Sequence, residues 1–266
     1  MADKHLISTQ KGQVATITIN RPAKMNALTD DLISALAHCL QHLAVDQTIR
    51  SVVIRGAADK AFCSGYDIDA LTPDRSRPTR TDERAEHPLE PAAQAIAAYP
   101  YPVIAMLNGD AFGAGCELAV CCDIRIAAED VRMGMPPAKI GVVYPWTGLQ
   151  RFVQAVGWNH TREMFFSGET VKGERLRSTG LVNHLVARDR LEPFTMTLAK
   201  RIAGNAPLAL IGIKKTLNLL AQNMMAMAPD DIAENRAAIL KALHSEDLIE
   251  GRRAFREKRK PHFKGI

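Results

Sequence analysis

A turn of small residues leads from an expected strand into an expected helix and carries the carboxylate best placed for chemistry. Residues 101–107 form an apolar run typical of a buried strand, and the turn at Gly113, Ala114 and Gly115 follows. Glu117 then falls in the first turn of an apolar helix. Small residues let the backbone approach a ligand, and the free N–H groups at a helix start point toward it. N–H donors beside one carboxylate can polarise a carbonyl group and move a proton. The pattern is equally consistent with an ordinary helix start, where the acidic residue only complements the helix dipole.

Composition narrows the class of protein. The 266 residues, 47% of them hydrophobic, are typical of one large globular domain or two unequal ones. The longest apolar runs are too short to span a bilayer, and residues 1–5 lack the order of a secretory signal. The five cysteines lie mostly in apolar stretches, which favours reduced thiols, and no Cys/His spacing resembles a zinc site. We therefore expect a cytoplasmic protein without a membrane span or a bound metal.

The net charge of +5 is concentrated near the carboxyl terminus. The basic residues there are Arg252, Arg253, Arg256, Lys258, Arg259, Lys260, His262 and Lys264. Such a run is often only a solvated face, and the functional alternatives are a small anion or nucleic acid. Aromatic residues make up 5% of the chain and no nucleic-acid motif is present, so the small anion is the better of these two.

Periodicity predicts an α/β body followed by helices. Strands are expected at residues 14–20, 51–55, 101–107 and 122–127, with an extended piece at 131–135. Thr29 is a suitable N-cap for a helix with leucines at 32, 36, 40 and 43. Residues 72–91, rich in proline and charge, are expected to form a loop or flap, or a solvated insertion. Helices are expected at 191–203, 208–227 and 232–242, in a part that packs on another subunit as well as on its own body.

Five segments in a fixed order, spread over nearly the whole chain, resemble the crotonase (enoyl-CoA hydratase/isomerase) superfamily. They lie at residues 20–28, 61–68, 108–123, 168–182 and 250–260. The resemblance implies an α/β (α+β) fold, with a ββα-spiral, acyl-CoA-binding catalytic domain at 1–190. It also implies a helical oligomerisation domain at 191–266 that forms a homotrimer or a dimer of trimers. The implied substrates are acyl-CoA thioesters of fatty-acid metabolism, with coenzyme A as part of the substrate and no permanently bound cofactor.

The family's shared device is an oxyanion hole of two backbone N–H groups, and the matching positions here are Tyr66 and Ala114. Such a donor is typically worth about 3 to 4 kcal/mol in stabilising an enolate oxygen. Tyr66 adds bulk and a hydroxyl at the pocket mouth, or shields one edge of the pocket. The resemblance implies that the acyl-CoA ligand contacts Lys24, Ser64, Tyr66, Asp67, Ile68, Gly113 and Ala114. A neighbouring subunit would add Phe255 and Lys258, which accounts for one or two of the basic charges near the terminus.

The chain departs from the family's hydratases at one position. Those enzymes use two glutamates to deliver water; Glu117 matches the first, whereas Pro137 stands in place of the second. Proline can neither hold nor donate a proton, so hydration by two glutamates is in doubt. Residues 141–145, with Tyr144, resemble methylmalonyl-CoA decarboxylase, a family member with a tyrosine there and only the first glutamate. In that relative, a histidine stands at the position of Tyr66. Tyr144 is also consistent with a core aromatic whose hydroxyl is satisfied.

Three functions follow from these observations. The first is an acyl-CoA lyase or isomerase of the enoyl-CoA hydratase type, with Glu117 as the proton-transfer residue. The second is a methylmalonyl-CoA-type decarboxylase, in which loss of CO2 generates the enolate and Tyr144 orients the leaving carboxylate. The third is a CoA-binding protein with an RNA-binding or interaction role. The basic residues are not interleaved with aromatics, which counts against the third function.

Overall fold

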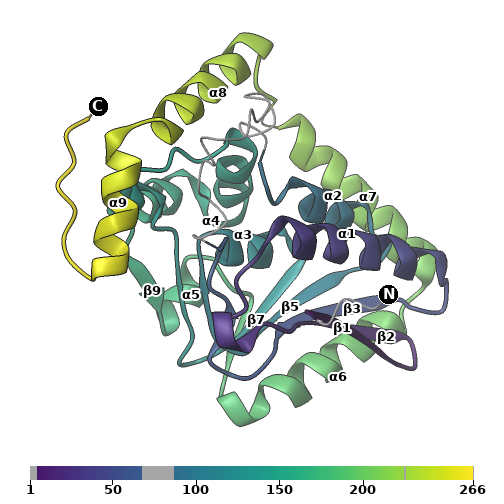
Figure 1. The fold of residues 1–266 in the computed structure, drawn as a ribbon. Helices are drawn as coiled ribbons and strands as arrows, with labels where there is room; N and C mark the ends of the chain where they lie inside the picture. The colour runs from purple at the N-terminus through teal and green to yellow at the C-terminus, as the bar shows by residue number, and fades with distance from the viewer. Residues whose placement is uncertain (1–4, 68–86, 225, 266) are drawn as a thin grey trace.

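Two β-sheets and a shell of helices make up the protein (Figure 1). The computed structural model describes residues 5–67, 87–224 and 226–265. Ile68 and residues 72–86 of the expected loop therefore lie outside the described residues. The larger sheet has the strand order β1-β2-β3-β5-β7-β10, and only its β1–β2 pair is antiparallel. Its strands are β1 (Leu6–Lys11), β2 (Val14–Ile19), β3 (Ser51–Gly56), β5 (Val103–Leu107), β7 (Ile124–Ala128) and β10 (His184–Val186).

The larger sheet confirms the strands expected from the sequence. β2, β3, β5 and β7 correspond to the four predicted runs, with ends that differ by at most two residues. Every residue of β5 is buried, because this strand lies between β3 and β7 and is covered on both faces. Burial on both faces explains why the sequence of β5 is an unbroken apolar run rather than an alternating one.

The second sheet is short, and its strands follow those of the first sheet along the chain. Its order is β4-β6-β8-β9, with only the β8–β9 pair antiparallel. Its strands are β4 (Ala61–Cys63), β6 (Asp110–Phe112), β8 (Arg132–Gly134) and β9 (Thr170–Lys172). Three times in succession, a strand joins the large sheet, the next strand joins the small one, and helical structure follows. This repeat is the ββα arrangement that the family resemblance implied.

Helices cover both faces of the large sheet. In Figure 1, α1, α2 and α3 lie on one side of it, and α6 lies on the other against β3, β5 and β7. The α-helices are α1 (Asp30–Val45), α2 (Glu90–Ala98), α3 (Ala114–Cys121), α4 (Trp146–Ser167), α5 (Glu174–Ser178), α6 (Leu191–Ala203), α7 (Pro207–Asn223), α8 (Pro229–Leu243) and α9 (Glu246–Glu257). The 3-10 turns are η1 (Pro22–Lys24), η3 (Pro137–Ile140) and η4 (Arg188–Arg190). None of the helices in these described parts is long and apolar enough to cross a membrane.

Local sequence signals predict some helix boundaries correctly and others wrongly. The Thr29 hydroxyl accepts a hydrogen bond from the Leu32 N–H at 3.3 Å, which confirms the predicted N-cap of α1. The predicted helix at 208–227 is too long, because α7 ends at Asn223. The predicted loop at 72–91 also extends too far, since Glu90 and Pro91 already belong to α2. Proline is tolerated there because the first helical residues need no N–H for the helix ladder.

The last residues of the chain fold back along α9, as Figure 1 shows. The N–H groups of Lys264 and Gly265 donate to Asp247 at 2.6 and 2.8 Å, and that of His262 donates to Glu250 at 2.9 Å. Acidic side chains of α9 form ion pairs with three members of the basic cluster: Arg253, Arg259 and Lys264. Much of the positive charge near the terminus is therefore balanced within the same segment, and less remains for a ligand than the sequence alone indicated.

A buried lysine attaches α7 to the body. The Lys214 ammonium donates to the carbonyls of Ile96 and Tyr101 at 2.9 and 3.0 Å, and lies 2.8 Å from the Asp123 carboxylate. Its three N–H donors are thus all used, which is the condition for burying an ammonium group at tolerable cost. The sequence analysis did not predict this contact, because it joins residues from α7, α2 and the start of β7.

We expect Lys214→Met to lower the free energy of unfolding by about 3 kcal/mol, because it leaves two buried carbonyls without their donor and removes the cation beside the Asp123 carboxylate. Urea unfolding at fixed protein concentration measures this loss. Lys215→Met is the matched control, since Lys215 is the next residue of α7 and is exposed. Equal stability of the two variants would contradict the role given to Lys214.

Candidate active site

The turn between β6 and α3 has the backbone conformation that its glycines permit. Gly113 has a φ of +52°, in the left-handed region that glycine adopts without a steric penalty. A Cβ atom on Gly115 would lie 2.1 Å from the Cys63 carbonyl oxygen, so only glycine allows α3 to pack on the end of β4. Ala114 is the first residue of α3, and Glu117 lies in its first turn as predicted.

A second glycine-containing bend, at Ser64 and Gly65, lies directly against the first. A Cβ atom on Gly65, whose φ is +107°, would lie 2.9 Å from the Phe112 carbonyl oxygen and 3.6 Å from the Ala114 nitrogen. Tyr66 pairs with Leu28 in a parallel bridge whose hydrogen bonds use the neighbouring groups of Gly65 and Asp67. Within the described parts of the chain, no hydrogen bond of the N–H groups of Tyr66 or Ala114 is recorded. The structure thus brings the two predicted donors to adjacent bends.

Glu117 is fully buried and surrounded by hydrogen-bond donors. The Tyr144 hydroxyl donates to its Oε2 at 2.5 Å, and Arg151 donates to its Oε1 at 2.8 Å. His87 Nε2 lies 2.8 Å from the same Oε2, without the alignment of a hydrogen bond. Arg151 also donates to Glu90 at 2.6 Å and so links α4 to both α3 and α2. We call the group of Glu117, Tyr144, Arg151, His87 and Glu90 the carboxylate cluster.

The carboxylate cluster keeps Glu117 ionised and Tyr144 protonated. Burial alone would raise the pKa of Glu117, but the contacts with His87, Arg151 and Tyr144 outweigh it, and the pKa is lowered. Burial and the adjacent Glu117 charge raise the pKa of Tyr144 well above its ordinary value. Tyr144 therefore offers one neutral hydroxyl proton beside a fixed carboxylate. Its hydroxyl is indeed satisfied, as the core interpretation required, but its partner is the candidate catalytic residue.

His87 has its proton on the ring nitrogen that faces Glu117. The Leu89 N–H donates to Nδ1 of His87 at 3.2 Å, so Nδ1 is an acceptor and Nε2, which faces Glu117, is the ring nitrogen left to carry a proton. The sequence analysis named neither His87, Arg151 nor Glu90. These residues lie before α2, on α4 and on α2, and no local pattern in the sequence connects them to Glu117.

The remaining predicted residues line the bends or lie apart from them. The Tyr66 hydroxyl donates to Asp30 at 2.5 Å, so it is bound to the start of α1 and its ring is half-buried. Burial and Asp30 raise the pKa of Tyr66. Ser64 is exposed, and its N–H donates to Met25 in the turn that follows Lys24. Asp67 forms an ion pair with Arg21 at 3.2 Å, so these two segments are held together.

Phe255 and Lys258 lie exposed at the carboxyl end of α9. This helix packs on η3 of the same chain, where Gly251 meets Ile140. The contacts described here do not join Phe255 or Lys258 to the turn that carries Lys24. Pro137 is buried as the first residue of η3 and brings no titratable group to this region.

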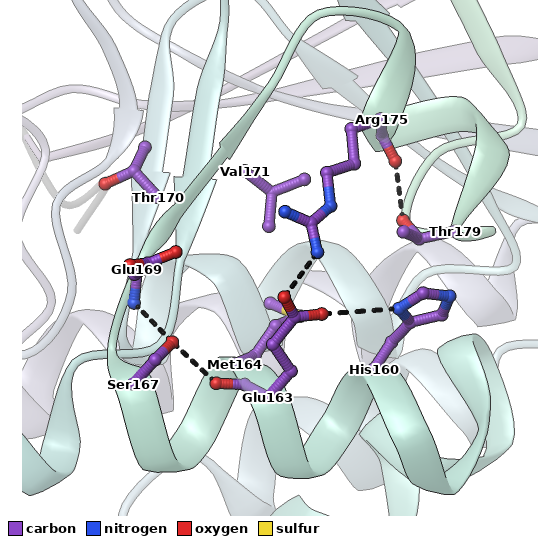
Figure 2. A pocket seen from close by; sticks show the side chains of 9 residues that line it. All are labelled: His160, Glu163, Met164, Ser167, Glu169, Thr170, Val171, Arg175 and Thr179. Atoms are coloured by element: carbon purple, nitrogen blue, oxygen red, sulfur yellow. Dashed lines mark hydrogen bonds and ion pairs between the residues drawn. The ribbon is translucent and has the colours of Figure 1, made fainter.

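Other candidate groups give no catalytic site. The five cysteines are free, and burial raises the pKa of Cys63 and of Cys122 to about 12, so neither forms a ready nucleophile. The described residues contain no cluster of side chains that could hold a metal ion. Figure 2 shows a pocket between α4, β9 and α5, in which Glu163 forms an ion pair with Arg175. Its volume of about 10 Å³ has room for one water at most.

Replacing Arg151 should change how the stability of the protein depends on pH. In the wild type, the lowered pKa of Glu117 contributes stability above the carboxyl's unfolded pKa, and this is lost as pH falls through the folded pKa. In Arg151→Met, burial should dominate and raise the pKa of Glu117 above its unfolded value. We expect a loss of about 3 kcal/mol at neutral pH that shrinks as pH falls toward 4.

Denaturant unfolding at several pH values, at one protein concentration, measures this difference in stability. Arg162→Met is the matched control, because Arg162 is exposed on the same helix. A loss of the same size at every pH would show that Arg151 does not hold Glu117 in its ionised form.

Comparison with known proteins identifies the family of the chain. Residues 9–266 match the family described as enoyl-CoA hydratase/isomerase. The chain is 33% identical to the 2,3-dehydroadipyl-CoA hydratase of Escherichia coli, with 98% of each chain covered. It is 32% identical to the methylmalonyl-CoA decarboxylase of the same organism, with 95% of each covered. A solved methylmalonyl-CoA decarboxylase complexed with 2S-carboxypropyl CoA superposes with a TM-score of 0.90 at 31% identity, over 100% of both chains. The chain therefore belongs to the enoyl-CoA hydratase/isomerase family and has the crotonase fold.

Proposed function

We propose that this protein is an acyl-CoA enzyme that stabilises a thioester enolate with the N–H groups of Tyr66 and Ala114. The adjacency of the two bends supports this assignment, as does the absence of any recorded partner for either N–H within the described residues. An enolate places its negative charge on one oxygen, which two fixed donors at a helix start stabilise without further reorganisation. Backbone donors do not depend on side-chain identity, so tyrosine and alanine serve equally well at these positions.

The coenzyme's nucleotide would lie along the paired segments that carry Lys24 and Ser64–Asp67. A solved neighbour that is a complex with 2S-carboxypropyl CoA supports binding of a CoA derivative by this fold. The Arg21–Asp67 ion pair and the Ser64–Met25 hydrogen bond hold the two segments together. Gly113 and Ala114 would face the thioester, while Phe255 and Lys258 from a second copy of the chain complete the site.

Decarboxylation of a malonyl-type thioester is the reaction that the carboxylate cluster supports best. The observation that carries this choice is the hydrogen bond from the Tyr144 hydroxyl to Glu117 at 2.5 Å. It places one neutral donor beside a carboxylate that also accepts a hydrogen bond from Arg151. Hydration by the usual route needs a second carboxylate, and Pro137 cannot supply one. Decarboxylation needs no base, because loss of CO2 itself leaves the enolate.

The charge of the cluster also favours loss of a carboxylate. Glu117 and Glu90 place two carboxylates against the single guanidinium of Arg151, so the cluster holds one more carboxylate than guanidinium. A substrate carboxylate held by Tyr144 would be repelled by this charge in the ground state. The repulsion is relieved when the carboxylate leaves as neutral CO2 and its electron pair moves to the thioester oxygen, toward Tyr66 and Ala114.

A lyase or isomerase reaction with Glu117 as the proton-transfer residue is the second candidate. It is supported by the 33% identity to a hydratase over 98% of each chain, and by the position of Glu117 beside the Ala114 N–H. In this reaction, Glu117 would have to release Tyr144 or Arg151 and take up a proton during turnover. The lowered pKa of Glu117 makes it a weak base at neutral pH, which is why this candidate is second.

One substrate panel with two variants separates the candidates. Purified protein is incubated with malonyl-, methylmalonyl-, enoyl- and 3-hydroxyacyl-CoA esters, and the products are identified by mass. We expect loss of CO2 from a malonyl-type ester, with kcat/KM lowered about 10- to 100-fold in Tyr144→Phe, the cost of one hydrogen bond to a charged group. Glu117→Gln should lower KM for that ester by removing repulsion, and lower kcat only modestly.

Tyr101→Phe controls for loss of a tyrosine hydroxyl outside the cluster. If enoyl-CoA hydration is the main activity, and it falls by about 100-fold or more in Glu117→Gln, then the proton-transfer role is correct and the decarboxylase proposal is wrong. A protein that binds CoA esters but converts none of them would favour the interaction role instead.

We also propose that the protein assembles as a trimer or a dimer of trimers through its helical carboxyl-terminal part. Ile213, Leu217, Leu220 and Met224 are spaced as one face along α7 and its end, and each is more than half exposed. An exposed apolar stripe of this kind marks an interaction surface. The buried contact of Lys214 fixes the position of α7 on the body and so fixes the direction in which the stripe faces.

We expect Leu217→Asp to convert the assembly to monomers in analytical ultracentrifugation, because it places a charge within the apolar stripe. Gln222→Asp is the matched control, since Gln222 is exposed on another face of α7. A monomeric wild-type protein that binds CoA esters with full affinity would exclude both the assembly and a contribution of Phe255 and Lys258 from a second copy.

A further inference from the structure

His87 is a buried side chain that has no role in the proposed reaction. Its side chain is 5% exposed, and its Nε2 has no aligned hydrogen bond to any of the described residues. An N–H group in this position costs free energy unless it finds an acceptor. The acceptor within reach is Oε2 of Glu117, at 2.8 Å.

Two donors therefore face one oxygen, and only one of them is aligned. Oε2 of Glu117 accepts the Tyr144 hydroxyl at 2.5 Å, while His87 Nε2 lies beside it. The His87 and Tyr144 rings meet edge to face, with centroids 5.4 Å apart and an interplanar angle of 89°. Movement of the hydroxyl away from Oε2 would leave that oxygen to His87.

Gly148 provides the space in which the two rings meet. A Cβ atom at this position of α4 would lie 2.5 Å from Cε1 of Tyr144 and 2.8 Å from Nε2 of His87. Any larger residue would push one ring away from Glu117. The lack of a side chain at Gly148 thus lets His87 and Tyr144 approach the same oxygen of Glu117.

We propose that His87 is a positioning residue that releases Tyr144 to the substrate: its Nε2–H takes over Oε2 of Glu117 while the Tyr144 hydroxyl donates to an anionic oxygen of the acyl group. The ligand class is a malonyl-type acyl-CoA, in which the carbon next to the thioester carbonyl carries a carboxylate. This inference rests on the proposed function, because it assumes that acyl-CoA binds at the two glycine-containing bends.

The exchange explains how one hydroxyl proton can serve two carboxylates. Tyr144 has a single donor, and in this structure it is bound to Glu117. If no other donor replaced the Tyr144 hydroxyl, binding of a substrate carboxylate would leave the buried Oε2 of Glu117 without this hydrogen bond. Such a loss at a charged group corresponds to roughly 10- to 100-fold in affinity. His87 removes this loss, since its proton is already on Nε2 and within 2.8 Å.

Binding of two thioether analogues tests this role without turnover. One analogue, 2-carboxypropyl-CoA, carries the carboxylate, and the other, propyl-CoA, lacks it. Calorimetry gives the ratio of their dissociation constants in each variant. His87→Asn keeps an acceptor for the Leu89 N–H but removes the donor that faces Glu117, whereas His87→Gln places an amide N–H near the position of Nε2.

We expect His87→Asn to reduce the preference for 2-carboxypropyl-CoA about 10-fold with propyl-CoA binding unchanged, and His87→Gln to retain most of the preference. Tyr144→Phe should abolish the preference, and adding His87→Asn to it should have no further effect, because the two residues act through the same oxygen.

An unchanged preference in His87→Asn would overturn the inference, as would an equal loss when it is added to Tyr144→Phe. Binding of both analogues with equal affinity by the wild type would also overturn it, while leaving CoA binding intact. If the wild type binds neither analogue, the proposed function itself fails. His87→Gln keeps the test decisive if His87→Asn does not fold.

Discussion

Burial of the Glu117 charge is the constraint on which the site depends. A carboxylate withdrawn from water must be matched by donors, and those around Glu117 come from three separate elements: Tyr144 before α4, Arg151 on α4 and His87 before α2. Arg151 adds Glu90 of α2 to the same group. The carboxylate therefore fixes how α2, α3 and α4 pack around one point, and structural and chemical roles cannot be separated there.

The contacts that stabilise this carboxylate also restrict what it can do. A general base needs a pKa near the working pH, whereas Glu117 already accepts hydrogen bonds from Tyr144 and Arg151 and has a lowered pKa. In the proposed function, the enolate therefore arises by loss of CO2, which needs no base and would move charge from the cluster toward the N–H groups of the two bends. Tyr144, whose pKa is raised by burial and by Glu117, remains a neutral donor throughout.

The basic carboxyl terminus has a more limited role than its composition suggests. Arg259 and Lys264 pair with Glu250 and Glu246 of α9 and so hold the tail along this helix, whereas Arg253 pairs with Glu250 within α9. Lys258, which ends the helix in the left-handed conformation, is exposed at the turn between helix and tail. The terminus thus acts first as a brace for α9. Any contact with a phosphate of coenzyme A falls to the one or two basic residues at this turn.

Much of the fold and part of the site could be predicted from the sequence. Short-range signals were sufficient for β2, β3, β5, β7 and the Thr29 cap, because burial on both faces and capping leave local patterns. They failed at the end of α7, where helix-forming residues continue past the observed boundary. They also failed at the start of α2, where prolines favoured the prediction of a loop. The sequence by itself determined the family and the two bends, since Gly65, Gly113 and Gly115 meet backbone requirements that only glycine satisfies. Only the tertiary structure decided the protonation of Glu117 and the partner of Tyr144, because the groups that set them are brought together by packing from distant parts of the chain.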